Sequence, residues 1–223
     1  MLSTETVWNR RHTTDELVSD STYNLTIGMV LLWGFAINFL MVENIDPAPI
    51  MAFRAQSPWM FLGVYFVSII AGTMIYTKSD SPGMSFVGYN FVVLPLGIVL
   101  VAMLPAFDSA VISKAFMATG CITGIMMMLG TAYPKAFLSI GRALFIAFIA
   151  TFVVEMGLYF FTGSVPGIFD WIMVLIFAGY IGYDWARAQS LPKTLDNAVD
   201  CAASLYVDIV ILFMRLLRLF SRR

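Results

Sequence analysis

The chain has 223 residues, of which 60% are hydrophobic and only 12% are charged, and its formal net charge is −1. A soluble domain usually carries about 25% charged residues, so this composition, with a mean hydropathy of +0.84, indicates an integral membrane protein whose first partner is the lipid bilayer. The balance of charge provides no basic surface, so we expect no nucleic-acid partner.

Seven apolar runs follow one another along the chain after a polar segment at residues 1–24. A membrane-spanning helix needs about 20 residues, and seven such helices use most of the chain. The expected spans, in order, are 25–42, 59–76, 86–104, 111–131, 140–161, 168–184 and 199–220. We therefore predict an all-α integral membrane protein with a single seven-helix transmembrane domain, residues 25–220.

Prolines and glycines add detail to these spans. Three prolines within residues 47–58 predict a loop between the first two spans, and Pro95 predicts a kink in the third. Gly120 and Gly124 in the fourth span are four residues apart, a spacing that lets helix backbones approach closely. We expect these two glycines to form a packing face inside the bundle.

Two aspartates lie where a membrane tolerates charge poorly. Asp184 closes the sixth span and Asp208 lies deep in the seventh. An ionised carboxylate at mid-bilayer costs roughly 2.5–3.5 kcal/mol on insertion scales, so such residues are functional candidates by default. If the two carboxyls meet, they cannot both ionise cheaply and would share a proton. Carboxylate oxygens also suit calcium, so the pair is a candidate pH sensor, ion gate and calcium-binding site.

Each aspartate also has a structural interpretation. Asp184 is three residues before Arg187 and fits a solvated charge at a helix end. Asp208 fits a buried pair with Arg215, or with a hydroxyl, that only orients helices. Ser204, Asp208 and Arg215 share one face of the last span. This polar stripe should face the bundle interior, where Ser204 and Arg215 are candidate pore or pairing residues.

Glu155 is the third acidic candidate and lies within the fifth span. It would line a permeation path, or pair with a basic residue such as Arg142 or Lys114, or act as a satisfied structural carboxylate. We expect Glu155 to face the interior and to modulate conduction without being the gate.

The segment 172–220 resembles the transmembrane Bax inhibitor motif family. The resemblance rests on Gly-Tyr-Ile-Gly-Tyr-Asp ending at Asp184, on Ser-Leu-Tyr-Val-Asp-Ile around Asp208, and on the short segments Leu-Phe and Leu-Leu-Arg, which end at Phe213 and Arg218. The family pattern is a Tyr-Asp at the end of the sixth span and a Leu-Tyr-hydrophobic-Asp in the last helix, and the spacing between the two aspartates also fits.

The resemblance implies a seven-helix fold with the last helix at its centre. It further implies a pH-sensitive calcium leak across the membrane, with Asp184 and Asp208 as the sensor, calcium and protons as the ions concerned, and no cofactor. A bacterial inner membrane is the expected location, and an organellar membrane is the alternative.

Two other classes of function compete with a leak channel. A non-conducting regulator that binds other membrane proteins is the main alternative, with unidentified partners. An intramembrane aspartyl protease would also place two aspartates on neighbouring helices, but it needs Gly-x-Gly-Asp where this chain has Leu-Tyr-Val before Asp208. We therefore expect no enzymatic activity.

Overall fold

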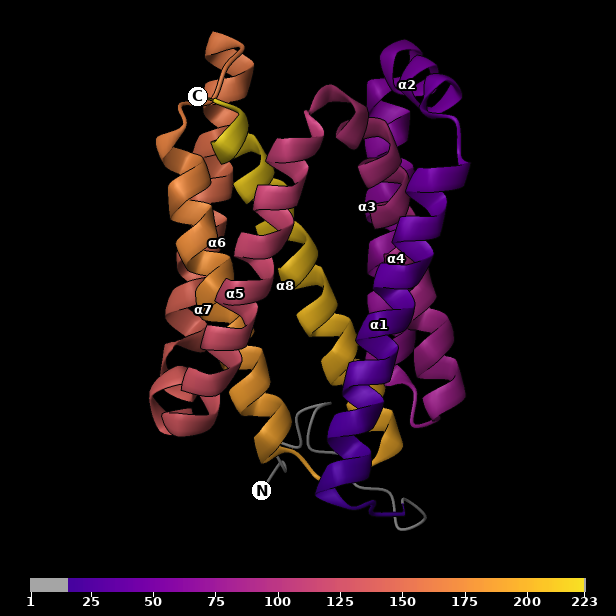
Figure 1. Cartoon of the computed structure of the whole chain (residues 1–223), viewed down its shortest axis with the longest axis vertical. Coiled ribbons are helices and arrows are strands. Elements are labelled where there is room, and N and C mark those ends of the chain that lie inside the picture. The colour runs from indigo at the N-terminus through magenta and orange to yellow at the C-terminus, as the bar shows by residue number, and fades with distance from the viewer. Residues whose placement is uncertain (1–15, 223) are drawn as a thin grey trace, which may run out of the picture. The chain divides into compact units, whose positions relative to one another are not determined.

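The computed structural model describes residues 16–222, and all of its regular structure is helical over that range. The helices are α1 (Asp20–Asn44), α2 (Pro47–Gln56), α3 (Pro58–Lys78), α4 (Pro82–Met103), η2 (Leu104–Ala106, a 3-10 turn), α5 (Ser109–Ala132), α6 (Pro134–Thr162), α7 (Ile168–Ser190) and α8 (Leu195–Ser221) (Figure 1). The all-α prediction is confirmed.

Six of these helices are long and apolar enough to cross a membrane: α1 and α3 to α7. The seventh expected span, α8, is not among them. It is 27 residues long, but charged residues occur along its whole length, from Asp196 near its start to Arg218 in its last turn. Length and composition therefore support an integral membrane protein with six spans among the described residues.

The first helix begins earlier than the sequence predicts. The side chain of Ser19 caps α1 by accepting a hydrogen bond of 3.1 Å from the backbone N–H of Thr22, and serine is a favoured residue at this position. The last residues of the expected polar segment 1–24 are therefore helical from Asp20 onward. Residues 1–15 of that segment lie outside the described residues.

The connection between the first two expected spans is not a loop. It contains α2, whose first residue is Pro47 and whose cap is Asp46, which accepts a hydrogen bond of 2.9 Å from the N–H of Ala48. Proline suits the first position of a helix because its missing N–H has no intrahelical partner there. The prolines that predicted a loop therefore start a helix instead.

The sixth expected span is longer than predicted. The helix α7 continues to Ser190, so Asp184 lies within the helix and not at its end. The neighbours of Asp184 are therefore set by helix packing and not by a connecting loop.

The helix α4 continues through Pro95, the residue at which the sequence predicts a kink.

The chain forms two compact units that share α8. Unit 1 comprises the chain up to Ala106 together with Leu191–Tyr206, and unit 2 comprises Phe107–Ser190 and the chain from Val207. Within unit 1, α3 and α1 both pack against α4, and within unit 2, α7 packs against both α5 and α6 (Figure 1). The first part of α8 thus belongs to one unit and its last four turns to the other.

Buried tyrosines and an asparagine occupy the centre of unit 1. Tyr89 and Tyr206 are fully buried, and their rings meet edge to face. The Tyr89 hydroxyl donates a hydrogen bond of 3.0 Å to the carbonyl of Val30, and the Asn38 amide donates to the Tyr206 hydroxyl. Each buried tyrosine thus has a hydrogen-bond partner, as burial of a hydroxyl requires.

A close approach of two helices in unit 2 depends on Gly130, which the sequence analysis did not single out. A Cβ added to Gly130 of α5 would lie 2.6 Å from the carbonyl oxygen of Gly182 in α7. Gly120 and Gly124 are exposed and would meet nothing within 4 Å. The prediction of a packing face at Gly120 and Gly124 is therefore wrong, and the close contact lies nearer the end of α5.

We expect Gly130→Ala to destabilise the protein by about 1–3 kcal/mol, because the added methyl group meets a backbone oxygen that cannot move aside. Gly120→Ala, the matched control on the same helix, should change stability little because that position is open. Thermal unfolding of both variants in the same detergent measures the difference. Equal effects of the two substitutions would mean that the α5–α7 contact is not tight.

Candidate functional site

The two aspartates singled out by the sequence meet within unit 2. Asp184 comes from α7 and Asp208 from α8, and their carboxyl groups lie in hydrogen-bonding contact with each other. The Asp184 side chain is 12% exposed and Asp208 is 7% exposed. Tyr180, one turn before Asp184 on α7, lies close enough to interact electrostatically with both carboxyls.

A hydrogen bond between two carboxyls needs a proton on one of them. The buried Oδ2 atom of Asp208 receives no hydrogen bond from any N–H or hydroxyl group within residues 16–222. A buried oxygen without a donor costs free energy, and two bare carboxylates at this separation repel each other. One proton held between Asp184 and Asp208 would relieve the repulsion between the two carboxyls.

The structural interpretation of Asp184 holds only in part. Arg187 is its neighbour one turn along α7, and the Arg187 Nη1 to Asp184 Oδ1 distance is 4.0 Å. This is the outer limit of an ion pair, and the Asp184 side chain is mostly buried. Asp184 therefore faces the carboxyl group of Asp208 and, at the limit of ion-pair distance, the guanidinium of Arg187.

The pair by itself is a poor resident calcium site. Two carboxyl groups offer only four oxygens, whereas bound calcium takes about six to eight oxygen ligands. The part of the chain that the structure describes contains no cluster of three or more His, Cys, Asp or Glu side chains suited to a metal ion. Calcium held at this pair would need further oxygen ligands.

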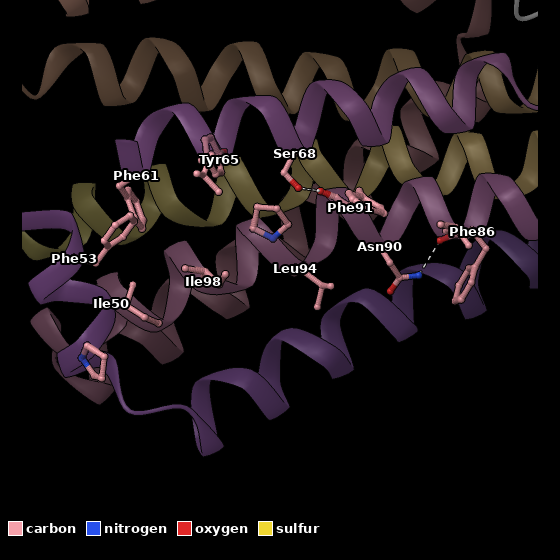
Figure 2. Close-up of a pocket in the computed structure, with 14 residues that line it drawn as sticks. Ile50, Phe53, Phe61, Tyr65, Ser68, Phe86, Asn90, Phe91, Leu94 and Ile98 are labelled. Carbon is pink, nitrogen blue, oxygen red and sulfur yellow. Dashed lines mark hydrogen bonds between the residues drawn. The ribbon is translucent and has the colours of Figure 1, made fainter. Parts of the chain in front are cut away.

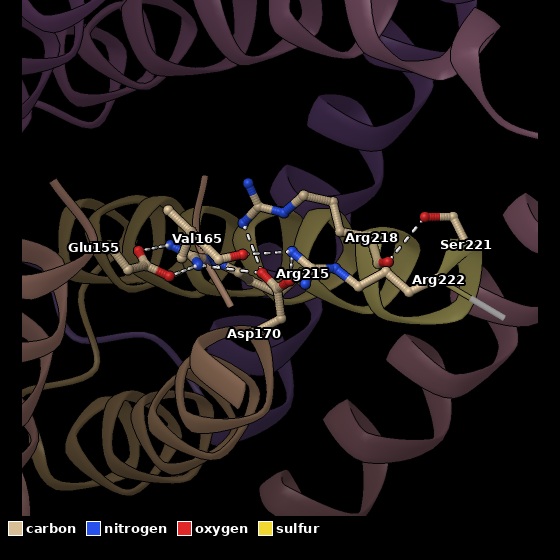
Figure 3. Close-up of polar contacts among 7 residues, drawn as sticks. All are labelled: Glu155, Val165, Asp170, Arg215, Arg218, Ser221 and Arg222. Carbon is tan, nitrogen blue, oxygen red and sulfur yellow. Dashed lines mark hydrogen bonds and ion pairs between the residues drawn. The ribbon is translucent and has the colours of Figure 1, made fainter. Parts of the chain in front are cut away.

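A second charged cluster in unit 2 surrounds Arg215 of α8 (Figure 3). Its guanidinium binds Glu155 of α6 through two parallel hydrogen bonds, one of which is 2.8 Å long, from Nη2 to Oε2. The same guanidinium lies 3.4 Å from Oδ1 of Asp170 in α7. A two-pronged arginine–carboxylate pair belongs to the strong, charge-assisted hydrogen bonds of proteins. Through these contacts Arg215 connects α8 with α6 and α7.

Asp170 is the centre of this cluster and was missed by the sequence analysis. It is 3% exposed and also binds Arg218 and Arg222, each through an Nη2 atom 3.2 Å from a carboxylate oxygen. The available signal was an acidic residue in the first turn of an apolar helix. That position also suits the helix dipole, so the pattern alone does not indicate an arginine partner.

The structure resolves several alternatives for the charged candidates. Glu155 pairs with Arg215, so the expected partners Arg142 and Lys114 were wrong. Arg215 in turn is bound to Glu155 and Asp170, so its interpretation as the partner of Asp208 was also wrong.

Ser204 belongs to a different compact unit from the two charged clusters. It is half-buried and belongs to the part of α8 that lies in unit 1. Asp208 and Arg215 belong to unit 2 and are both largely buried. The polar stripe predicted along one face of α8 is thus divided between the two units.

A cavity of about 790 Å³ lies in unit 1 among α2, α3 and α4 (Figure 2). Two of its polar side chains are hydrogen-bonded: Ser68 donates to the carbonyl of Phe91, and Asn90 accepts from Trp33 and donates to the carbonyl of Phe86. The rest of the lining is apolar or aromatic, and no charged residue is among the described residues that form it. This cavity therefore suits hydrocarbon and offers calcium no ligand.

Six helices of membrane-spanning length and two buried charge clusters define an integral membrane protein that keeps ionisable groups inside a helical bundle. The family model described as "Inhibitor of apoptosis-promoting Bax1" matches residues 16–223, and the chain belongs to this family. The resemblance inferred from the residues around Asp184 and Asp208 is thereby confirmed and extends over nearly the whole chain.

Two curated relatives share low sequence identity with this chain. An uncharacterized membrane protein of Streptococcus pyogenes serotype M3 is 27% identical over 133 residues, which cover 56% of this chain and 58% of the relative. The inner membrane protein YbhL of Escherichia coli strain K12 is 23% identical over 137 residues, which cover 57% of this chain and 58% of the relative. The chain thus spans less than two thirds of the relatives that it matches.

Proposed function

We propose that this protein is a pH-sensitive calcium leak channel gated by the proton shared between Asp184 and Asp208. One observation carries the proposal: α7 and α8 hold two largely buried carboxyls in hydrogen-bonding contact, and one of their oxygens has no other donor within the described chain. A protein that needs only structural stability gains little from such a pair, because apolar residues of similar size are often equally stable or better.

The mechanism follows from the charge state of the pair. With one proton, the carboxyls hold α7 and α8 together through a hydrogen bond. Without it, two like charges repel each other in a medium of low dielectric constant, and this repulsion favours separation of the helices. Cations are then attracted to the freed carboxylates, whose oxygens are the ligands that calcium prefers.

The proposal includes the arrangement in the membrane. The helix α8 is the seventh span and lies at the centre of the bundle, because its charges are tolerated only where other helices pair them. Pairing of Arg215 with Glu155 and Asp170, and of Asp208 with Asp184, supports this assignment. The relative YbhL of Escherichia coli is an inner membrane protein, which supports a bacterial inner membrane for this chain.

Calcium flux through purified protein in liposomes tests the proposal. A fluorescent calcium indicator sealed inside the vesicles should report a leak that exceeds that of empty vesicles and depends on pH. Vesicles containing heat-denatured protein control for damage to the bilayer. Flux equal to that of empty vesicles at every pH would contradict the channel and favour a non-conducting regulator of other membrane proteins.

Glu155 should influence the rate of the leak but not its pH dependence. The pair of Glu155 with Arg215 lies seven residues along α8 from Asp208, about 10 Å along the helix axis. We expect Glu155→Gln to change the leak rate several-fold while the pH midpoint stays nearly constant, as measured in the same liposomes. A large shift of the midpoint would make Glu155 part of the sensor.

A further inference from the structure

The end of α8 carries more positive than negative charge. Arg215, Arg218 and Arg222 lie on one face of the helix, and the carboxylates that they bind are those of Glu155 and Asp170. Three guanidinium groups thus face two carboxylates, which leaves one positive charge in excess. The excess positive charge lies at the protein surface, because the side chains of Arg218 and Arg222 are each 44% exposed whereas the Asp170 side chain is 5% exposed.

This excess charge lies at one surface of the membrane. The candidate spans α6 and α7 end and begin at Thr162 and Ile168, so the connection between them lies at that surface. Arg222 donates a hydrogen bond of 3.2 Å from Nη2 to the carbonyl of Val165 in this connection (Figure 3). Gly167 lets the side chain approach, because a Cβ there would lie 2.7 Å from Arg222 Nη1.

Exposed aromatic side chains flank the connection between α6 and α7. They belong to the last turns of α6 and the first turn of α7 and are exposed: Tyr159, Phe160, Phe161 and Trp171. Tyrosine and tryptophan are enriched where a membrane protein meets the lipid headgroups, which fits Tyr159 and Trp171. The two exposed arginines therefore lie at the depth of lipid phosphates, beside apolar surface that acyl chains would cover.

We propose that Arg218 and Arg222, positioned by Asp170, bind the phosphate headgroup of an anionic phospholipid. Each guanidinium has five N–H donors in a planar fork that matches a phosphate, and the contacts to Asp170 and to the carbonyl of Val165 use one nitrogen of each arginine. Basic pockets between membrane helices are a recurring form of headgroup site. Asp170 holds the two guanidinium groups next to each other. Two surface arginines without a shared carboxylate would not be held in this way.

Native mass spectrometry of the full chain in detergent, titrated with phosphatidylglycerol or phosphatidylcholine, tests this site. The unmodified protein should retain phosphatidylglycerol in preference to phosphatidylcholine. The double variant Arg218→Gln/Arg222→Gln should weaken phosphatidylglycerol binding about 25-fold, or about fivefold for each arginine. The control Arg54→Gln/Arg142→Gln removes the same charge from two exposed arginines elsewhere and should leave the affinity unchanged.

Single variants and a competition with inorganic phosphate complete the test of the lipid site. If the double variant does not fold, the single variants Arg218→Gln and Arg222→Gln carry the test, each with the fivefold loss. An equal loss in the control pair would mean that only net charge matters and would overturn the site. Displacement of the lipid by inorganic phosphate would assign a soluble anion instead and would also overturn it. The measurement needs no ion flux, so its result is independent of the proposed channel.

Discussion

Asp208→Asn is expected to flatten the pH dependence of the calcium leak, and Asp184→Asn should do the same. Asparagine keeps a hydrogen bond to the remaining aspartate but cannot gain or lose a proton, so the step that creates two like charges disappears. In the unmodified protein, the leak should rise as increasing pH removes the shared proton. The double variant should add little to either single variant, because the two carboxyls titrate as one unit.

Calcium flux in liposomes over a series of pH values measures this effect. Asp46→Asn is the matched control: Asp46 is an exposed aspartate whose side chain caps α2, and asparagine serves equally well as a cap. Its pH profile should equal that of the unmodified protein. A normal profile for Asp184→Asn would show that Asp184 is only a structural charge, and the two-aspartate gate would then be wrong.

Arg215→Met should be the most destabilising single substitution in the charged cluster. It leaves Glu155 without its partner in a site where the Glu155 side chain is 11% exposed. Removing one partner of a buried ion pair costs about 3–5 kcal/mol, which corresponds to a fall of about 6–20 °C in the unfolding temperature of a chain of this size. Asp170 keeps two of its three arginine partners in this variant, so it should contribute less than Glu155 to the lost stability.

The double variant Glu155→Leu/Arg215→Met separates an unpaired charge from a simple loss of packing. It removes both charges, and replacement of a complete buried ion pair by apolar residues is often neutral or stabilising. Thermal unfolding in detergent should therefore show most of the lost stability restored. Arg142→Met, at an exposed arginine on the same helix as Glu155, should have little effect. A double variant as unstable as Arg215→Met would contradict the proposed role of the pair.

Hydropathy predicted most of the fold because membrane helices need long apolar runs, and such runs are visible in any single chain. Each of the six helices that can cross a membrane contains one of the predicted spans. The errors lie at the ends, where caps decide the boundary: Ser19 starts α1 early, and Pro47 begins a helix where proline had predicted a loop. A cap depends on one or two side chains and leaves little trace in composition.

The sequence by itself determined the membrane class, the family and the two aspartates, since each depends on the order of residues along the chain. Only the tertiary structure decided which charges meet. Glu155 and Arg215 are 60 residues apart, and Asp170 lies in a different helix from both. The periodicity of a helix tells which residues share a face, but the residues opposite that face depend on how neighbouring helices are packed, as at Gly130 and Gly182.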